Sequence, residues 1–573
     1  MGTLDRLARK VRTRITQMIA TLLATQVGST HYFEKCAVVS DHELSSQAGV
    51  EIMRQGGNAI DAAVATGLSL AVTFPAAGNI GGGGFMVIRT KDGKTLAIDY
   101  RETAPKGATR NMYLDASGKP TQDSTFGYKA SGVPGTVAGF YEAHKRFGKL
   151  PWSSVVAPAI RQAREGFTLN YQTANEFKRV ATEGKQFAGT WRIFGRNGNF
   201  YNTGERFKQP ELAETLERIA KQGREGFYRG KTAELMQQEM KVGGGLITSQ
   251  DLADYQAIPR DALVGDFSLN GNLKGYRVIT MPPPSSGGVI LLMMLGMLDK
   301  DDLARSGFNS SETVHLMTET MKRCFADRSE YMGDPGYVDV PVEKLLNPMY
   351  LAMRRAEISL TKATPSTQIR PGLTPKRESE HTTHYSVVDS EGNAVANTYT
   401  LNTGYGSKVT LGSIGVLMNN EMDDFASLPG STNGYGLIQG EANAIAAGKR
   451  PLSSMTPTIL EKGGELFLVT GSPGGPTIIN TVMEVILNTT VHGMDIQRAV
   501  SAPRFHHQWF PDQIRYEPWG FSADTIEKLK SIGQFPMSAG SSQGSAHSIK
   551  ISQGGTRGIG LDPRVSTSGS AGY

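Results

Sequence analysis

The pattern of apolar positions predicts a protein built from both strands and helices. Runs such as Phe85–Arg89, Leu96–Tyr100 and Leu466–Thr470 have the length and composition of buried strands. Apolar residues at three- and four-residue spacing predict helices at 45–56, 137–146, 153–165, 212–221, 289–298, 310–328 and 478–491. Asn58 is the predicted N-cap of a further helix. The mixture indicates a helical layer packed on sheet.

A predicted β-hairpin occupies residues 382–402. Its two β-branched strands are joined by Ser390–Asn393, and it begins on two adjacent threonines, Thr382 and Thr383. A cut between His381 and Thr382 would give Thr382 a free α-amine, with a pKa of about 8, beside its own hydroxyl. The hairpin sets Thr382 opposite residues 400–402, with the register open between Thr400 and Asn402. From this stretch alone, ordinary strand threonines are the favoured interpretation.

Two glycine clusters are candidates for close backbone approach. Gly78–Phe85 runs into a strand and lacks the Lys-Ser/Thr ending of a phosphate-binding loop, so backbone crowding is the favoured interpretation. In the second cluster, Gly474 and Gly475 stand at a strand-to-helix turn. Their N–H groups could face a developing oxyanion, although a plain glycine turn is the more frequent structure.

Charged and hydroxyl side chains at other strand ends are candidates for substrate binding. Arg101 leaves a strand and could hold a carboxylate with its planar guanidinium, although most such arginines are solvated. Glu421 and Asp424 suit an ammonium group better than a metal, since no histidine cluster accompanies them; a solvated loop is the alternative. Ser453 and Ser454 lie at the mouth of a strand.

Composition narrows the class of protein. The chain has 573 residues, enough for two ordinary domains or one large layered one. Its net charge of +6 comes without a long basic tract outside the amino terminus, so nucleic acid is not implied. Two cysteines, Cys36 and Cys324, exclude a disulfide scaffold and a cysteine-based metal cluster, and their own pairing stays open. No metal or other cofactor is expected.

Three segments are predicted from their composition to lie outside the packed elements. Residues 1–30 begin with five basic side chains followed by a weakly apolar stretch, which indicates a secretory signal, with a basic amphipathic helix as the alternative. Residues 361–378, rich in Pro, Ser and Thr, are predicted to form an exposed linker. Residues 426–448, with Tyr435, are predicted to form a long loop over a pocket.

Seven ordered motifs make the chain resemble the γ-glutamyltranspeptidase family over residues 37–573. They are Asn79-Ile-Gly-Gly-Gly-Gly-Phe85, Asp99-Tyr-Arg-Glu-Thr-Ala-Pro105, Met281-Pro-Pro-Pro-Ser-Ser-Gly-Gly288, His381-Thr-Thr-His-Tyr385, Arg450-Pro-Leu-Ser-Ser-Met455, Thr470-Gly-Ser-Pro-Gly-Gly475 and Ala571-Gly-Tyr573. The resemblance implies an α+β N-terminal-nucleophile hydrolase fold, a four-layer αββα sandwich. It also implies self-cleavage into a large subunit, 37–381, and a small one, 382–573, after an amino-terminal segment, 1–36. The resemblance also implies periplasmic or secreted placement, although the amino-terminal segment departs from the family pattern.

The same resemblance implies roles for individual residues. Thr382 would be the nucleophile and Thr400 the hydroxyl that orients it, with the N–H groups of Gly474 and Gly475 binding the oxyanion. Arg101, Ser453 and Ser454 would hold the α-carboxylate of a γ-glutamyl group. Its α-amine would contact Asn402, Glu421 and Asp424. Tyr435 would belong to a lid. The implied substrates are glutathione and related γ-glutamyl compounds, with water, amino acids or peptides as acceptors.

Two residues depart from the family pattern or lie where it varies. His381 replaces the glutamine of bacterial members, and Glu421 stands where members differ between glutamine and glutamate. Two alternative functions also stay open. One is a β-lactam side-chain acylase, which takes a glutaryl group without an α-amine, and the other is a non-catalytic protein that binds γ-glutamyl compounds.

Overall fold

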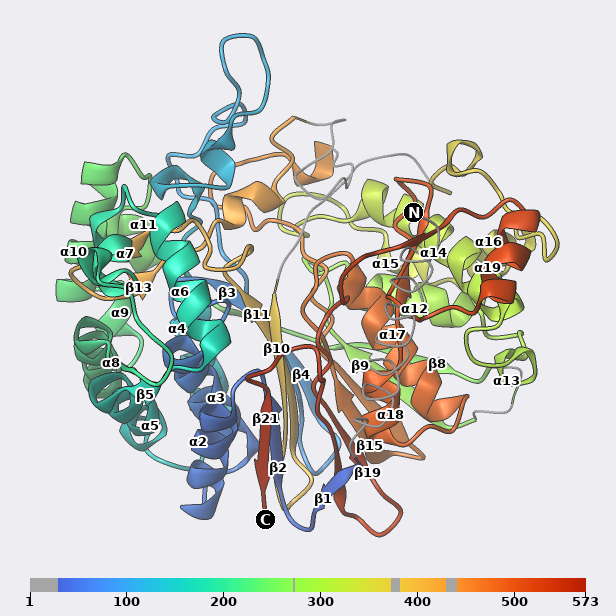
Figure 1. Cartoon of the computed structure of the whole chain (residues 1–573), viewed down its shortest axis with the longest axis horizontal. Coiled ribbons are helices and arrows are strands. Elements are labelled where there is room, and N and C mark those ends of the chain that lie inside the picture. The colour runs from blue at the N-terminus through green and yellow to red at the C-terminus, as the bar shows by residue number, and fades with distance from the viewer. Residues whose placement is uncertain (1–28, 270, 272–273, 373–381, 429–440) are drawn as a thin grey trace, which may run out of the picture.

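The molecule is a four-layer sandwich of two sheets between two layers of helices (Figure 1). The computed structural model describes residues 29–269, 271, 274–372, 382–428 and 441–573. In this part of the chain two seven-stranded sheets lie face to face, and helices cover the outer face of each. The αββα arrangement expected from the resemblance is confirmed.

The first sheet, called the hairpin sheet here, carries the predicted hairpin at its centre. Its strand order is β21 (Gly569–Gly572), β2 (Ala37–Ser40), β10 (Thr383–Val388), β11 (Ala394–Thr400), β3 (Gly83–Arg89), β4 (Thr95–Tyr100) and β7 (Ile258–Arg260). The opposite sheet, called the facing sheet, has the order β1 (His31–Phe33), β20 (Arg557–Gly560), β19 (Ser548–Ile551), β15 (Glu465–Thr470), β14 (Thr458–Lys462), β9 (Tyr276–Thr280) and β8 (Leu263–Phe267). Side chains such as Phe85, Val87, Ile279 and Val469 fill the space between the two sheets.

Each sheet has its own helical layer. The layer on the hairpin sheet contains α2 (Glu43–Arg54), α3 (Ala59–Thr73), α4 (Thr136–Phe147), α5 (Trp152–Glu165) and α8 (Pro210–Gln222). The layer on the facing sheet contains α12 (Gly287–Met297), α14 (Ser311–Tyr331), α16 (Pro348–Ala356), α17 (Thr477–Thr490), α18 (Ile496–Ser501) and α19 (Ala523–Ser531).

The described chain contains further α-helices, short strands and 3₁₀ helices, one of which spans Glu421–Asp424. The α-helices are α6 (Tyr171–Glu183), α7 (Ala188–Ile193), α9 (Glu225–Tyr228), α10 (Gly230–Gly243), α11 (Ser249–Asp254), α13 (Leu303–Ser306) and α15 (Val342–Leu345). The strands are β5 (Phe167–Thr168), β6 (Arg206–Phe207), β12 (Thr410–Leu411), β13 (Val416–Leu417), β16 (Phe505–His506), β17 (Ile514–Tyr516) and β18 (Pro536–Ser538).

The hairpin is anchored to helix α3. Asn58 caps this helix as predicted, and its side chain accepts hydrogen bonds from the N–H groups of Ile60 and Asp61. Two hairpin tyrosines reach the helix: Tyr385 donates to the carbonyl of Ala63 at 2.8 Å and Tyr399 to that of Gly67 at 2.9 Å. Burial of such a ring contributes about 1.5–3 kcal/mol, and the hydrogen bond satisfies its hydroxyl.

The glycine run at the start of β3 allows two strands to meet closely. A Cβ on Gly82 would lie 2.0 Å from the carbonyl oxygen of Thr400, and one on Gly84 would lie 2.4 Å from the Cβ of Tyr399. Glycine is therefore the residue that lets β3 pack against the end of β11. The predicted backbone-crowding role is confirmed.

The segment predicted as an exposed linker, 361–378, is only partly described. Most of residues 361–372 are exposed, but Ala363, Ser366 and Ile369 are buried, so this part is packed on the protein. Trp509 donates from its indole N–H to the carbonyl of Ser366 at 2.9 Å, which holds this segment against the protein. Residues 373–378 lie outside the described residues.

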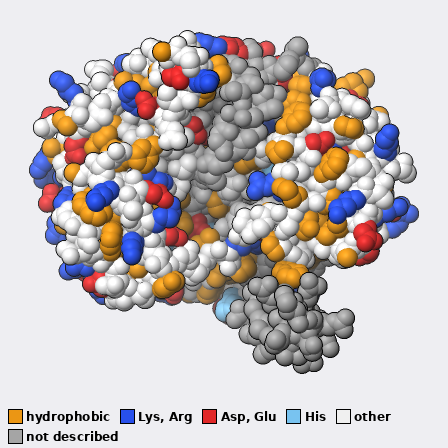
Figure 2. Space-filling model, turned by 45° about the horizontal axis from the view of Figure 1, so that its top comes forward, with side chains coloured by type: hydrophobic (Ala, Val, Ile, Leu, Met, Phe, Trp, Pro, Cys, Tyr) orange, Lys and Arg blue, Asp and Glu red, His pale blue; other side chains and the backbone are white. Residues whose placement is uncertain are grey.

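Charged side chains of both signs lie on the face shown in Figure 2. Basic and acidic side chains are interspersed there, without a continuous basic field. Cys36 and Cys324 are both buried and free, so they do not pair with each other. Within the described ranges, no helix is long and apolar enough to cross a membrane, and no group of three or more His, Cys, Asp or Glu residues could hold a metal ion.

Candidate active site

Thr382 lies at the open end of the hairpin sheet. It is half-buried and directly precedes β10. The antiparallel register pairs Thr383 with Tyr399, so one further step sets Thr382 opposite Thr400. This settles the register that the sequence left open, in favour of Thr400.

Thr400 and Asn402 form a compact turn at the end of β11. The Thr400 hydroxyl accepts a hydrogen bond from the N–H of Asn402 at 2.7 Å. Asn402 has a positive φ of 73°, and its side-chain amide donates to the carbonyl of Asn420 at 2.9 Å. Its Oδ1 atom is buried and has no hydrogen-bond partner among the described residues. A buried acceptor of this kind is suited to a donor supplied by a ligand.

Arg101 joins the two predicted acids in one buried cluster. Its guanidinium donates to the carboxylates of Glu421 and Asp424, which lie on one short 3₁₀ helix. It also donates to the carbonyl oxygens of Pro451 and Leu452, at 3.1 and 3.0 Å. The predicted carboxylate-binding group therefore pairs with the predicted ammonium-binding groups.

Burial governs protonation in this cluster. Glu102 lies 3.6 Å from the Arg101 guanidinium, and neither of its carboxyl oxygens has a hydrogen-bond partner among the described residues. Burial raises the pKa of Glu102 to about 7 against the opposing effect of Arg101. Burial likewise raises the pKa of Glu421 well above its usual value, and the neighbouring carboxylates add to the shift. The single positive charge of Arg101 therefore lies beside the carboxyl groups of Glu102, Glu421 and Asp424, which is more than it can neutralise.

A second buried arginine supports the serine pair. Ser454 accepts a hydrogen bond from the Arg328 guanidinium, which also donates to the hydroxyl of Ser286 at 2.9 Å. Ser453 donates from its backbone to the carbonyl of Pro284 at 3.1 Å. The two predicted serines are thereby fixed against the Pro282–Ser286 segment, and Arg328 supplies positive charge beside them.

Gly474 and Gly475 form a turn between β15 and α17. Their φ angles are 123° and 66°, a region that favours glycine. Neither N–H donates a hydrogen bond to another described residue. The turn lies near the hairpin, since a Cβ on Gly471 would come within 2.4 Å of the His384 ring. Two free N–H groups before a helix N-terminus are suited to a negative oxygen.

Two predicted residues cannot be placed. His381, before the predicted cut, and Tyr435, in the predicted lid, lie outside the described residues.

Comparison with known proteins gives the family. The γ-glutamyltranspeptidase family model matches residues 45–572. The chain belongs to the γ-glutamyltranspeptidase family. It is 47% identical to a glutathione hydrolase proenzyme of Escherichia coli, over 94% of this chain and 91% of that protein. It is 44% identical to the proenzyme of Pseudomonas aeruginosa, over 90% and 91% of the two chains.

Solved structures support the same fold. A cephalosporin acylase from Bacillus halodurans has a TM-score of 0.84 at 28% identity and covers 95% of this chain and 97% of that one. A γ-glutamyltranspeptidase of Helicobacter pylori has a TM-score of 0.56 at 43% identity, over 58% of this chain and 94% of that one. The chain therefore has the N-terminal-nucleophile hydrolase fold of this transpeptidase family.

The sequence analysis did not identify two charged residues that contact the candidate site, Glu102 and Arg328. Glu102 directly follows Arg101, so an acid beside a candidate anchor was the available signal. Arg328 lies on α14, a helix buried along nearly its whole length although it carries several charged residues. Charged residues on a buried helix need partners, but the sequence does not say which ones.

Proposed function

We propose that this chain is a γ-glutamyltranspeptidase that cuts itself before Thr382 and then cleaves the γ-glutamyl amide of glutathione and related compounds. The observation that carries the proposal is the register that sets Thr382 opposite Thr400, at the strand ends where Arg101 and its two acids are buried. Family membership and the proenzyme relatives support it.

Self-cleavage would use the Thr382 hydroxyl on the carbonyl carbon of residue 381. The C–N bond of that peptide breaks, the nitrogen takes the hydroxyl proton, and an ester to the Thr382 oxygen forms. Water then hydrolyses the ester, which leaves a carboxylate on residue 381 and a free α-amine on Thr382. Thr382 would then hold nucleophile and base in one residue.

Turnover would proceed through an acyl-enzyme. The α-amine of Thr382 takes the hydroxyl proton, and the oxygen attacks the γ-carbonyl carbon of the substrate. The N–H groups of Gly474 and Gly475 would hold the resulting oxyanion. Collapse of this intermediate breaks the amide bond, the leaving amine takes the proton, and γ-glutamyl-Thr382 remains. Water releases glutamate, and an amino acid or peptide amine would accept the γ-glutamyl group instead.

The glutamyl head group matches the buried charges. Its α-carboxylate would pair with Arg101 and accept hydrogen bonds from Ser453 and Ser454. Its ammonium would pair with the carboxylates of Glu421 and Asp424 in place of Arg101. It would also donate a hydrogen bond to the unpartnered Oδ1 of Asn402. The substrate would thus replace the internal pairing of Arg101 with the two acids by one ion pair at each end of an α-amino acid.

The acylase alternative rests on the fold match to the cephalosporin acylase. A glutaryl group has the carboxylate for Arg101 but no ammonium, so Glu421, Asp424 and the Asn402 oxygen would stay unmatched. Comparison of γ-glutamyl- and glutaryl-p-nitroanilide hydrolysis separates the two, and the γ-glutamyl substrate is expected to be cleaved with the higher kcat/KM.

The decisive experiment is the intact mass of the purified protein. We expect two fragments, the smaller beginning at Thr382, together with γ-glutamyl-p-nitroanilide hydrolysis. Thr382→Ala should give one uncut, inactive chain, whereas Thr382→Ser keeps a hydroxyl and should still be cut. An uncut wild-type chain without activity would favour a non-catalytic binding protein instead.

A further inference from the structure

A buried polar cluster lies next to the nucleophile but outside the substrate site. The Thr383 hydroxyl donates to Oδ2 of Asp41, and Nε2 of His547 lies 2.8 Å from Oδ1 of the same carboxylate. The three residues are at most 1% exposed. Since a carboxylate only accepts, Nε2 of His547 carries the proton in this contact.

The cluster connects the two sheets at the end where Thr382 emerges. Asp41 directly follows β2, and Thr383 is the first residue of β10, which pairs with β2. His547 directly precedes β19 of the facing sheet. One carboxylate therefore bridges the residue after Thr382 to the opposite sheet.

The order of the three groups shows what they can do. Asp41 stands between the hydroxyl and the imidazole, so His547 receives no proton from Thr383 and does not activate it. Asp41 instead fixes the direction of the Thr383 hydroxyl, and His547 fixes Asp41. The arrangement is suited to holding the backbone rather than to a second nucleophile.

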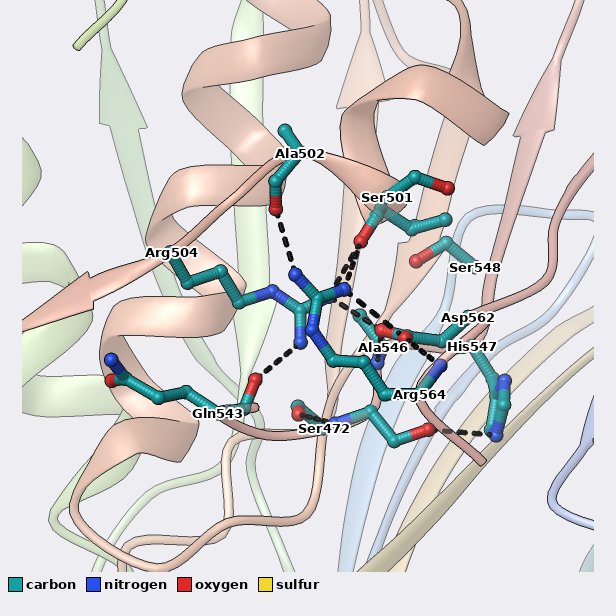
Figure 3. A network of polar contacts seen from close by, with 12 residues as sticks. Ser472, Ser501, Ala502, Arg504, Gln543, Ala546, His547, Ser548, Asp562 and Arg564 are labelled. Carbon is teal, nitrogen blue, oxygen red and sulfur yellow. Dashed lines mark hydrogen bonds and ion pairs between the residues drawn. The ribbon is translucent and has the colours of Figure 1, made fainter. Parts of the chain in front are cut away.

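The segment that carries His547 also contacts Ser472, which precedes the glycine turn (Figure 3). Ser545 donates from its backbone to the Ser472 hydroxyl at 3.0 Å, two residues before Gly474. Ala546 donates from its backbone to Asp562 at 2.6 Å, and Asp562 also accepts from Arg504. The hairpin end and the glycine turn are thus fastened to one short segment.

We propose that Asp41 and His547 are positioning residues that set Thr382 relative to the N–H groups of Gly474 and Gly475. The inference rests on the proposed function, since it concerns the same nucleophile. Loss of this hold should lower kcat and slow self-cleavage. KM should stay nearly unchanged, because no described contact links the cluster to Arg101, Glu421 or Asp424.

The test compares variants that break the contacts with variants that keep them. Asp41→Ala removes the contacts with Thr383 and His547, together with the longer one from the Ser545 hydroxyl at 3.5 Å. We expect kcat for γ-glutamyl-p-nitroanilide to fall about 10- to 100-fold, as for misplacement by about 1 Å, with KM within about twofold. Asp41→Asn can accept from Thr383 and donate to the other tautomer of His547, so its kcat should stay within about threefold. His547→Gln should likewise have a higher kcat than His547→Ala.

Glu461→Ala is the matched control for lost stability. Glu461 accepts from Arg89 at 2.8 Å in a buried pair that joins β14 to β3 at the other end of the strands. Rates are measured per mole of Thr382 amino terminus, determined by mass spectrometry, and Tm is recorded for every variant. An Asp41→Ala kcat no lower than that of Glu461→Ala, or a KM that rises as kcat falls, would overturn the inference.

A second pair of variants decides the matter if Asp41→Ala does not fold. Thr383→Val removes only the hydroxyl, and Thr383→Ser restores it. We expect the valine variant to lose kcat at constant KM and the serine variant to recover it; equal kcat values would again overturn the inference. A wild-type protein that is cut and active while all these variants match Glu461→Ala would refute the positioning role but leave the proposed function intact.

Discussion

The Arg101 guanidinium donates a hydrogen bond to the Asp424 carboxylate, and both side chains are almost fully buried. Glu421 makes the same kind of contact from the same short helix. The site therefore places charges of both signs side by side, as a zwitterionic head group needs. A ligand with only one of the two charges would leave part of this cluster unpaired.

Asp424→Asn should weaken recognition of the ammonium more than that of the carboxylate. A hydrogen bond to a charged group contributes about 1.5–3 kcal/mol, so inhibition by L-glutamate should weaken about 10- to 100-fold. Inhibition by glutarate, which has no ammonium, is the internal control and should change much less. Inhibition constants from γ-glutamyl-p-nitroanilide hydrolysis measure both. Parallel weakening of the two inhibitors would contradict the ammonium role.

Glu102→Gln should alter the pH dependence of stability. Burial raises the pKa of Glu102 to about 7 in the folded protein from an ordinary 4.5, so the folded state binds more protons than the unfolded state between these values. The wild-type carboxyl thus lowers the free energy of unfolding as pH rises from about 4.5 to 7. Tm of Glu102→Gln relative to wild type should therefore be higher at pH 8 than at pH 5. A Tm difference that does not change with pH would show that the pKa of Glu102 is not raised in the folded protein.

Gly82→Ala should disturb the end of β11. The new Cβ would meet the Thr400 carbonyl at 2.0 Å, so the backbone must shift, at a cost of about 1–3 kcal/mol. Thr400 would move with it, and both Tm and the fraction cut before Thr382 should fall. Gly107→Ala is the control, because its Cβ would meet only Leu246, at 3.8 Å. Equal behaviour of the two variants would argue against the close strand contact.

Arg328→Lys should weaken the support of the serine pair. Lysine keeps the charge but cannot direct two bonds from one planar group to Ser286 and Ser454. Loss of one such bond predicts a KM for γ-glutamyl-p-nitroanilide that is about 3- to 10-fold higher. Arg355 lies on α16 and pairs with Asp301. The variant Arg355→Lys provides the comparison and should leave KM unchanged. An unchanged KM for Arg328→Lys would show that Arg328 does not support substrate binding.

Local chemistry explains which features the sequence could predict. The hairpin, the α3 cap and the crowded glycines each depend on neighbouring residues, so periodicity and residue type were sufficient. The hairpin register needed a cross-strand partner, which only the fold supplies. Residue type at the strand ends indicated Arg101 and Asp424, and the resemblance gave them roles, but their mutual pairing depends on a contact across 323 positions.

Long-range pairing explains what the sequence could not predict. Asp41 and His547 are 506 positions apart, and neither belongs to a recognisable motif. Residues 361–372 have the composition of a linker, yet Trp509 holds them by a backbone carbonyl. In both cases a distant side chain determines the structure, and nothing in the local pattern indicates it.

The strand order has a consequence for the protein once it is cut. A break before Thr382 would assign β21, β10 and β11 to one polypeptide and β2, β3, β4 and β7 to the other, so the hairpin sheet would be interleaved, with β2 clamped between β21 and β10. The facing sheet would be shared in the same way, with β1, β9 and β8 flanking four strands of the carboxy-terminal piece. The two pieces could not separate without breaking backbone hydrogen bonds in both sheets. The cut protein should therefore unfold in a single cooperative transition.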